Sequence, residues 1–486
     1  MIKRDTKTRI VVTVCATMAL LACVRAKATE PVRAVVTGEM AASATTHSLS
    51  NPTATPETVN LYQLLWKNYG EKILSGTMAE VAWNTKEADR VYRLTGKYPA
   101  INGFDYIHLP YSGENWIDYT DISPVADWAE KGGIVTISWH WNVPTLPLAA
   151  DKVAIRTCGI QRYHITGDSV QTLLAGVAKG DRIFVRYEKA DAKARAGFWA
   201  ADNTTLKDAD GLSYGNFPIG GSRSTYGKSK CDATAFSIEL DDTMLGQIHN
   251  GFSIVGSGYV ITGVNLVKKG SDVFTFNPEK TSFKMSRALV EGSLENKIIK
   301  ADIDKVASCL KLLQDKHIAV LWRPLHEAAG GWFWWGASTR EDFIALWRYM
   351  YHDFSRRGLN NLIWVWTSEQ KTPSWYPGDE YVDIIGRDRY NVSDASTMTD
   401  MYNDMKTSYP DKIITLSECG SVPPIDEQWK NGAMWSWFMP WYGEATLGVP
   451  HATDLWWKDA TQSDKVLYLD DIREMKRDGS SQKVKY

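Results

Sequence analysis

The sequence lacks the short motifs that mark most metal and nucleotide sites. It contains no HExxH pair, no close CxxC spacing and no compact His/Asp cluster, and neither a phosphate loop nor a dinucleotide-binding fingerprint occurs. Basic residues are not in excess either, because the formal net charge is -2 and the pI is near 6.5. A protein that binds nucleic acid through phosphate contacts needs such an excess. The sequence therefore predicts no metal, no cofactor and no nucleic-acid partner.

Long apolar runs are scarce and are confined to the N-terminus. Lysines and arginines within residues 3–9 precede an apolar run, residues 10–22, that is too short to span a bilayer as a stable helix. This pattern predicts an export signal over residues 1–23. The letters LLAC at its end resemble a bacterial lipobox, which favours Cys23 as a lipidated first residue, with ordinary signal-peptidase cleavage as the alternative. We therefore expect an exported protein, an outer-membrane lipoprotein or otherwise a periplasmic or secreted protein.

The segment after the signal has no hydrophobic period. Residues 24–58 are rich in Ala, Thr, Ser and Pro, a composition that cannot support a core. We predict that they form a flexible tether and that the folded part begins at Val59.

Cysteine is scarce beyond the signal. Of the four that remain, Cys158 and Cys231 fall in one segment, so a disulfide between them is a hypothesis for an oxidising compartment. The spacing alone does not decide the pairing.

From residue 59 onward, strand-like and helix-like segments alternate, apart from one interruption. Apolar strands that alternate with helices form parallel sheets, and eight such units form a (β/α)8 TIM barrel. The expected strands cover residues 72–76, 98–105, 133–141, 318–327, 362–367, 382–389, 413–418 and 433–438. The expected helices cover residues 59–70, 85–95, 123–131, 295–316, 339–357 and 396–408. We therefore predict a barrel built from residues 59–155 and 271–486.

Polar and aromatic side chains gather at the ends of these strands. Barrels carry their active sites on the face formed by the carboxyl ends of the strands. The residues at or near those ends are Asp105, His140, Glu327, Thr367, Arg389, Glu418 and Trp437. Packing requirements alone do not explain seven such residues on one rim, so this rim is the predicted active site.

The interruption, residues 156–270, has short alternating runs separated by Gly, Asp, Asn and Ser turns. This pattern predicts an inserted all-β domain, a jelly-roll-like sandwich placed after the third barrel strand. One interpretation is a carbohydrate-binding module, and the alternatives are a structural cap or a platform for another protein. Rings expected to be exposed there are Tyr163, Trp199, Tyr214, Phe217 and Tyr226.

Tryptophan, by contrast, is abundant: 21 residues, more than packing alone needs, and stacking on sugar faces is a natural use for the surplus. The stretch 318–336, IAVLWRPLHEAAGGWFWWG, ends an apolar strand in titratable groups beside four aromatic residues. Cleaving a glycoside with retention requires two carboxyl groups about 5–5.5 Å apart. Glu327 on the fourth strand and Glu418 on the seventh are placed to provide them.

The two glutamates need different pKa values. We expect apolar surroundings and nearby negative charge to keep Glu327 protonated, while Arg323 and Tyr390 donate to Glu418 and keep it ionised. In a regular strand His326 points away from its neighbour Glu327, unless a bulge turns it inward.

The motif WRPLHE over residues 322–327, the following GGWFWWG, and LSECG over residues 416–420 resemble glycoside hydrolase family 26, the retaining β-mannanase family of clan A. The resemblance covers residues 61–141 and about 274–457, and leaves out the insert. It implies that Glu327 is the acid/base and Glu418 the nucleophile. It further implies that Tyr390 bonds the nucleophile, that His326 and His140 contact the sugar at the cleavage point, and that Trp332 and Trp437 form aromatic walls.

Several of these residues have plainer alternatives. Asp105 is either a sugar ligand or a helix cap, and Arg389 either binds a sugar hydroxyl or pairs with Asp388 or Asp105. Trp435 and Trp437 lie two apart on one face of the last strand, so either is the candidate platform.

The sequence as a whole predicts an endo-β-1,4-mannanase that acts on mannan, glucomannan or galactomannan with retention, and we expect it to be a monomer. Alternatives within the family are an exo-acting mannobiohydrolase, a xylanase and a mixed-linkage glucanase. A surface glycan-binding lipoprotein without turnover is the alternative from another class, and retention of both Glu327 and Glu418 argues against it.

Overall fold

A computed structural model describes residues 47–80, 82–107, 109, 117–145, 153–155, 161–188, 190–191, 193–219, 224–231, 235–269, 274–369, 373–446 and 449–481. The predicted export signal with Cys23, and the tether as far as residue 46, lie outside these residues, so export and lipid anchoring stay predictions. Cys158 lies outside them too, and its pairing with Cys231 stays a hypothesis. Within the described residues, no helix combines the length and the apolar character that a membrane span needs.

Eight parallel strands form a closed barrel, which confirms the predicted fold. They are hydrogen-bonded in the order β2-β3-β16-β17-β18-β19-β20-β1, and pairing of β1 with β2 closes the ring. Their bounds are β1 Ile73–Met78, β2 Ile101–Asp105, β3 Ile134–Trp139, β16 Val320–Pro324, β17 Leu362–Thr367, β18 Ile384–Tyr390, β19 Ile413–Gly420 and β20 Trp437–Pro440. A two-residue strand, β23 (Val466–Leu467), pairs with β1 outside the ring.

The barrel strands are buried on both faces, apart from the last two residues of β18, Arg389 and Tyr390, as their largely apolar sequences predict. In β17, Ile363 and Val365 belong to the cluster that fills the barrel interior, whereas Trp364 and Trp366 belong to the cluster between strands and helices. Successive side chains of a strand point to opposite faces, so the two sets alternate. Trp364 is therefore a core residue.

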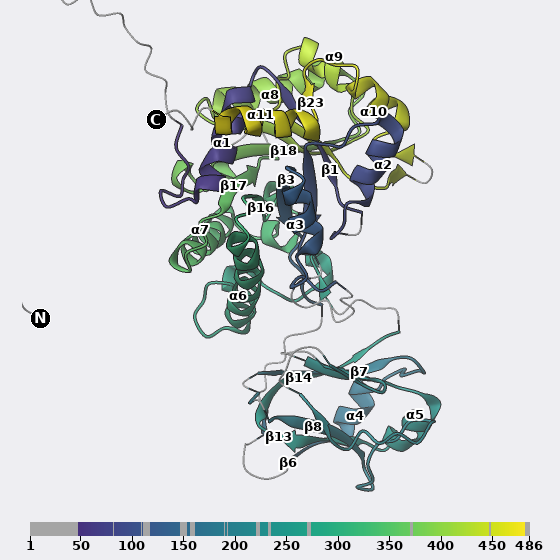
Figure 1. The fold of residues 1–486 in the computed structure, drawn as a ribbon. Coiled ribbons are helices and arrows are strands. Elements are labelled where there is room, and N and C mark those ends of the chain that lie inside the picture. Colours follow the sequence, from purple (N-terminus) through teal and green to yellow (C-terminus); the bar gives the residue numbers. More distant parts are fainter. Residues whose placement is uncertain are drawn as a thin grey trace, which may run out of the picture. The chain divides into compact units, whose positions relative to one another are not determined.

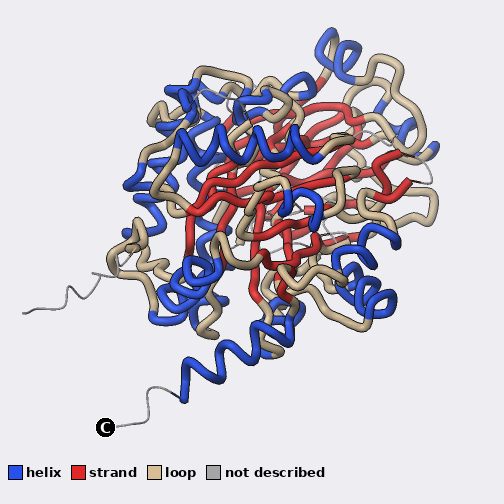
Figure 2. Tube along the Cα trace, turned by 90° about the horizontal axis from the view of Figure 1, so that it is seen from above, coloured by secondary structure: helices blue, strands red, loops and turns tan. Residues whose placement is uncertain are grey.

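Helices surround these strands (Figures 1 and 2). They are α1 Pro56–Asn68, α2 Lys86–Thr95, α3 Ser123–Glu130, α6 Leu294–Asp315, α7 Arg340–Arg356, α8 Ala395–Ser408, α9 Ile425–Lys430, α10 Asp454–Ala460 and α11 Leu469–Ser481. Many start at a side-chain cap, as at Ser293 of α6 and Thr339 of α7, whose hydroxyls accept a backbone N–H of the first turn.

The predicted tether extends too far. Helix α1 already begins at Pro56, because Thr55 caps it and proline suits the first helical turn. Ser50 is fixed as well, since its backbone N–H donates to Asp383 over 2.6 Å. The folded part therefore begins before Val59. The Ala, Thr, Ser and Pro composition of this segment does not reveal the helix, because the start of the helix depends on one capping residue, Thr55.

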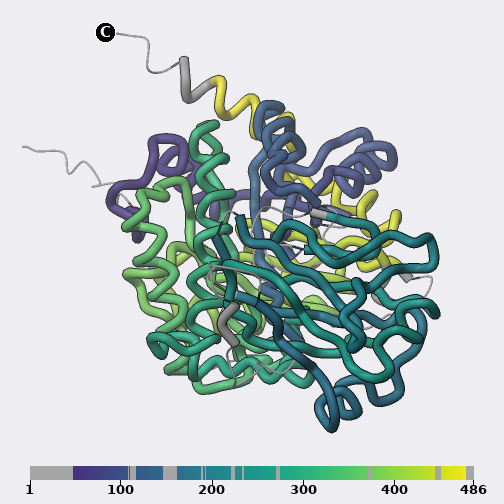
Figure 3. Tube along the Cα trace, turned by 90° about the horizontal axis from the view of Figure 1, so that it is seen from below, coloured from purple at the N-terminus to yellow at the C-terminus, as the bar shows by residue number. Residues whose placement is uncertain are grey.

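The inserted domain is a sandwich of two antiparallel sheets with a hydrophobic core of its own. One sheet has the order β10-β11-β12-β7-β14-β5 and the other β6-β13-β8-β9. The bounds are β5 Val153–Ile155, β6 Gln161–Ile165, β7 Arg182–Glu188, β8 Arg195–Ala200, β9 Phe217–Pro218, β10 Ser224–Tyr226, β11 Ser229–Cys231, β12 Ala235–Glu239, β13 Phe252–Ser257 and β14 Tyr259–Val267. Two short helices, α4 (Asp168–Leu173) and α5 (Asp242–Ile248), belong to it, and Figure 3 traces its strands in teal.

The insert begins earlier than the predicted residue 156, because β5 pairs with β14. Where the chain leaves and re-enters the barrel, β4 (Val143–Pro144) pairs antiparallel with β15 (Phe274–Thr275). This short ladder brings the two ends of the insertion together.

Candidate active site

The backbone after β16 is irregular, and this irregularity places the predicted acid. The strand ends at Pro324, and the next residues include Leu325 at φ 50° and Glu327 at φ 53°. Side chains other than glycine seldom adopt this left-handed conformation, which costs about 1–3 kcal/mol for each residue. The turn brings His326 to the site, since its Nε2 lies 3.2 Å from Nε2 of His140. A regular strand would point His326 away from the site, and the left-handed residues on either side of it are the departure that turns it inward.

Glu418 on β19 accepts hydrogen bonds from two predicted neighbours. Arg323 donates from Nη2 to Oε1, and the Tyr390 hydroxyl donates to Oε2 over 2.9 Å. Arg323 is only 1% exposed, and its other terminal nitrogen donates to Asp388 over 2.8 Å. The guanidinium thus lies between two carboxylates and holds Glu418 in one orientation.

Sequence reasoning missed Asp388. Its Oδ1 accepts from Ser417 Oγ over 2.7 Å and its Oδ2 from Arg323, so both oxygens are engaged. Asp388 and Tyr390 lie two residues apart on β18 and therefore point to the same face of the sheet. This spacing from Tyr390 is the sequence signal that could have identified Asp388.

Arg389, which lies between Asp388 and Tyr390, is exposed. Its predicted pairing with Asp388 or Asp105 does not occur, because those carboxylates bond other partners, and a role in sugar binding stays a prediction.

The carboxyl groups of Glu327 and Glu418 lie close together and differ in their pKa values. Burial, reinforced by the negative charges of Asp388 and Glu418, raises the pKa of Glu327 to about 9. Burial also raises the pKa of Glu418, to about 7, against the opposing effect of Arg323. The proton that the pair shares therefore resides on Glu327, whereas the raised pKa of Glu418 runs against the expectation that Arg323 and Tyr390 keep this carboxyl group ionised.

His140, just after β3, is held by Asp105 at the end of β2. One oxygen of Asp105 accepts from the His140 backbone N–H over 3.0 Å, and the other contacts its Nδ1. Burial alone would lower the pKa of His140, but Asp105 outweighs burial and raises it. Both carboxylate oxygens of Asp105 contact His140, so Asp105 is not the helix cap that the sequence suggested, and direct contact with a sugar stays a prediction. Asp105 positions His140.

Only one of the four aromatic residues after Glu327 is exposed. Trp332 is 48% exposed, and its Nε1 donates to Glu327 Oε2 over 2.7 Å. Phe333, Trp334 and Trp335 are buried. Trp332 is therefore the residue of this group that can offer a ring face to a sugar.

The predicted aromatic platform on the last strand is wrong. Trp435 is buried and donates from Nε1 to Gln428, and Trp437 is buried in the barrel interior opposite Leu74. The half-buried ring at the rim is Trp441, 5.6 Å from the His140 ring, and its backbone N–H donates to Cys419. The expected strand stopped at residue 438, but the inward alternation continues through residues 439 and 441.

Three carboxylates could offer oxygen ligands to a cation. Glu327, Asp388 and Glu418 each have an oxygen within 4.8 Å of the others. Asp388 and Glu418 already share the guanidinium of Arg323. A positive charge in direct contact with two of these carboxylates is therefore built into the chain.

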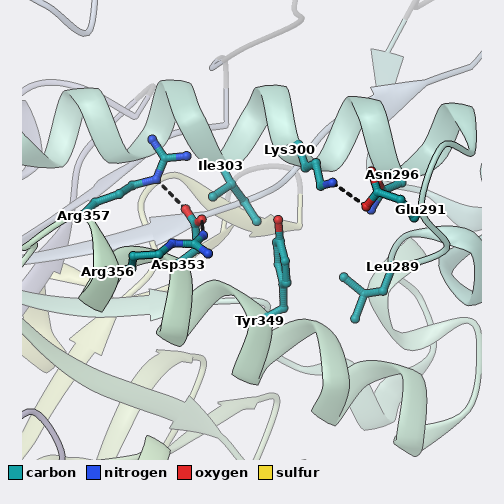
Figure 4. A pocket seen from close by; sticks show the side chains of 9 residues that line it. All are labelled: Leu289, Glu291, Asn296, Lys300, Ile303, Tyr349, Asp353, Arg356 and Arg357. Carbon is teal, nitrogen blue, oxygen red and sulfur yellow. Dashed lines mark hydrogen bonds and ion pairs between the residues drawn. The ribbon is translucent and has the colours of Figure 1, made fainter.

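The surface of the described barrel residues has hollows, of which two bear on where the site lies. One, of about 540 Å³, is lined by Trp441 and Tyr442 together with α2 residues such as Glu87 and Arg90, so it adjoins the rim. The other lies between α6 and α7 (Figure 4). Its charges pair within its own wall, as Lys300 does with Glu291, and it contains none of the predicted site residues.

Comparison with known proteins agrees with this geometry. A sequence model described as glycosyl hydrolase family 26 matches residues 50–171 and 252–451, and thus omits the centre of the insert. A mannan endo-1,4-beta-mannosidase of Thermothelomyces thermophilus is 28% identical over 434 residues, 88% of this chain and 63% of that protein. Mannan endo-1,4-beta-mannosidase B of Piromyces sp. is 35% identical over 212 residues, 43% of this chain and 36% of that protein. The chain thus spans less than two thirds of each of these relatives.

Solved structures are similar over most of the chain. The GH26 domain of an endo-beta-mannanase/endo-beta-glucanase from Prevotella bryantii has a TM-score of 0.57 at 33% identity, covering 87% of this chain and 98% of that one. A beta-mannanase from a symbiotic protist of the termite Reticulitermes speratus, solved with a gluco-manno-oligosaccharide, has a TM-score of 0.56 at 27% identity, covering 87% and 97%. With the barrel, the paired glutamates and the matched family model together, the chain belongs to glycosyl hydrolase family 26.

Proposed function

We propose that this glycoside hydrolase is a retaining endo-β-1,4-mannanase that uses Glu327 and Glu418. The observation that carries the mechanism is the separation of the two carboxylates, which have oxygens within 4.8 Å of each other. Retaining glycosidases place their carboxyl groups about 5–5.5 Å apart, whereas inverting enzymes leave roughly 6.5–9.5 Å for a water molecule. The short separation supports attack by a side chain rather than by water.

In the first step Glu418 attacks the anomeric carbon, and the bond from that carbon to the leaving-group oxygen breaks. Glu327 gives its proton to that oxygen, so the leaving sugar departs as an alcohol and Glu418 carries a glycosyl ester. In the second step Glu327, now ionised, takes a proton from water, and the water oxygen displaces Glu418. Both carboxyl groups return to their starting states.

The surrounding residues support these roles. Arg323 and Tyr390 donate to Glu418 and aim it, and burial keeps the proton on Glu327. Trp332 contacts Glu327 and offers an exposed ring at the same point. His140, held by Asp105, and Trp441 line the other side of the site.

Mannan as substrate is supported by the names of the relatives, since both curated proteins described above are mannan endo-1,4-beta-mannosidases. The Prevotella bryantii protein combines endo-mannanase and endo-glucanase activities across its domains. Exo action, xylan and mixed-linkage glucan are the competing possibilities, and a binding protein without turnover would not need a proton donor beside a nucleophile.

A screen of the purified protein against mannan, glucomannan, galactomannan, xylan and mixed-linkage glucan tests the substrate. We expect cleavage of the three mannans and, by chromatographic sizing, early products of mixed length, because an endo enzyme cuts within the polymer. Mannobiose as the only early product would show exo action. Cleavage restricted to xylan or mixed-linkage glucan would contradict the proposed substrate.

Two alanine variants test the roles of the glutamates. Glu418→Ala should abolish hydrolysis of mannan and of aryl mannobiosides alike, because no nucleophile remains. Glu327→Ala should lose about 10²–10⁴-fold on mannan but much less on aryl glycosides whose leaving group needs no proton. Steady-state kinetics on both substrates measure the difference, and the exposed Glu341→Ala on α7 serves as a control. Near-normal turnover by the Glu418 variant would refute the assignment.

We also propose that the inserted sandwich binds glycan, although its rings support this less than the sequence suggested. Tyr214 and Phe217 are buried in its core, which corrects the expectation that they are exposed. Tyr226 is 38% exposed, and the half-buried Trp199 has the Arg162 guanidinium 4.6 Å from its ring centre. Tyr226 is thus the ring best placed to stack on a sugar.

Deleting the insert tests this role. Because β4 and β15 pair where the insertion begins and ends, residues 147–272 can be replaced by a short glycine linker. Hydrolysis of soluble oligosaccharides should persist, while binding to insoluble mannan, measured by pull-down, should weaken. Unchanged affinity for the polymer would favour a structural cap. The point variant Tyr226→Ala should weaken binding in the same direction, and Tyr92→Ala, on barrel helix α2, is its exposed control.

A further inference from the structure

One carboxyl group at the rim has no use in the mechanism described above. Glu369 follows β17 by two residues, and the backbone N–H of its neighbour Ser368 donates to Gly386 over 2.8 Å, which keeps this segment beside β18. Among the described residues, the buried Oε1 of Glu369 has no hydrogen-bond partner. An unsatisfied buried acceptor costs free energy, so its presence requires an explanation.

Glu369 belongs to the same electrostatic cluster as the catalytic groups. The charges of Asp388 and Glu418 act on it, and it acts in turn on Glu327. Burial raises the pKa of Glu369 to about 8. Near neutral pH the side chain is therefore mostly a carboxylic acid, which can both donate and accept a hydrogen bond.

The ring of strands defines where a sugar chain can run. Glu327 follows β16 and Glu418 lies on β19, so β17 and β18 separate them on one side, and β20, β1, β2 and β3 on the other. On that second side lies the hollow beside Trp441, Tyr442 and α2. A chain that passes between the two glutamates from this hollow reaches the rim at β17 and β18, where Glu369 and the exposed Arg389 lie.

The leaving sugar belongs on the β17 side of Glu327. Its oxygen must touch Glu327 to receive the proton, and the sugar must then continue past that residue. Toward β3 the neighbouring side chains are packed together, since the buried rings of His326 and Phe333 lie 4.4 and 5.5 Å from the ring of His140, which follows β3. Toward β17 the leaving sugar would meet the half-buried Glu369 and the exposed Arg389.

We propose that Glu369 and Arg389 form a subsite for the leaving-group sugar, in which the unpaired carboxyl oxygen of Glu369 accepts a sugar hydroxyl and Arg389 donates to a neighbouring oxygen. This inference rests on the proposed glycosidase mechanism and adds a specificity determinant to it. A site that fixes hydroxyl positions discriminates strongly, because a sugar that lacks the matching hydroxyl leaves buried polar groups unpaired.

The test compares two substrates for each variant. One is the β-1,4-linked oligosaccharide that the wild type cleaves fastest, and the other is the 4-nitrophenyl glycoside of its disaccharide, in which no sugar occupies the leaving-group subsite. For Glu369→Ala and Arg389→Ala, kcat/KM on the oligosaccharide should fall about tenfold to hundredfold more than on the nitrophenyl glycoside. Glu341→Ala is the matched control.

Equal changes on the two substrates, or a larger loss on the nitrophenyl glycoside, would overturn the subsite. Arg389 is exposed, so its variant keeps the test valid if the Glu369 variant unfolds. The substrate pair is chosen from whichever polymer the wild type cleaves. Failure on mannan would therefore contradict the proposed substrate, while the ratio of the two kcat/KM changes would still decide the subsite.

Discussion

The site depends on the buried guanidinium of Arg323. It bonds Asp388 and Glu418 at once, and it is almost fully shielded from solvent. An unpaired charge in such a place would be strongly unfavourable, so the three groups hold one another in place, and removing Arg323 would leave two buried carboxylates without their shared guanidinium. The same contact favours the ionised form of Glu418. The neighbouring negative charge, with burial, then keeps the proton on Glu327, so one ion cluster sets the protonation states of the proposed nucleophile and the proposed acid.

The barrel provides the frame for this cluster through departures from regularity. The pairing of β18 with β19 shifts register between Arg387 and Asp388, and that of β19 with β20 shifts again beyond Leu416. After β16, left-handed residues turn the chain at the acid. Such departures persist where surrounding packing enforces them, and they are common at active sites. Regular strands thus position the site, and the irregular residues at their ends aim its side chains.

Much of this could be predicted from sequence, because the informative patterns are local. Alternating apolar segments indicated the barrel, and glutamates after two of its strands, seen with the WRPLHE motif, indicated the catalytic pair. The incorrect predictions concern the alternation of side chains along the last strand and the contacts that a residue makes with another strand. An expected strand end at residue 438 places Trp437 at the rim, whereas the strand runs on to Pro440 and the rim ring is Trp441. Asp105 needed His140 as its partner before its role was visible, and such contacts between strands leave no mark on either strand alone.

The central claim is that Glu327 and Glu418 catalyse two successive displacements at the anomeric carbon. Between these two steps Glu418 is covalently bonded to the sugar. The anomeric configuration of the first product tests it most directly. Proton NMR of a manno-oligosaccharide digest, recorded before mutarotation equilibrates the anomers, should show the newly formed reducing end appearing as the β-anomer. Initial release of the α-anomer would show inversion and would contradict the account.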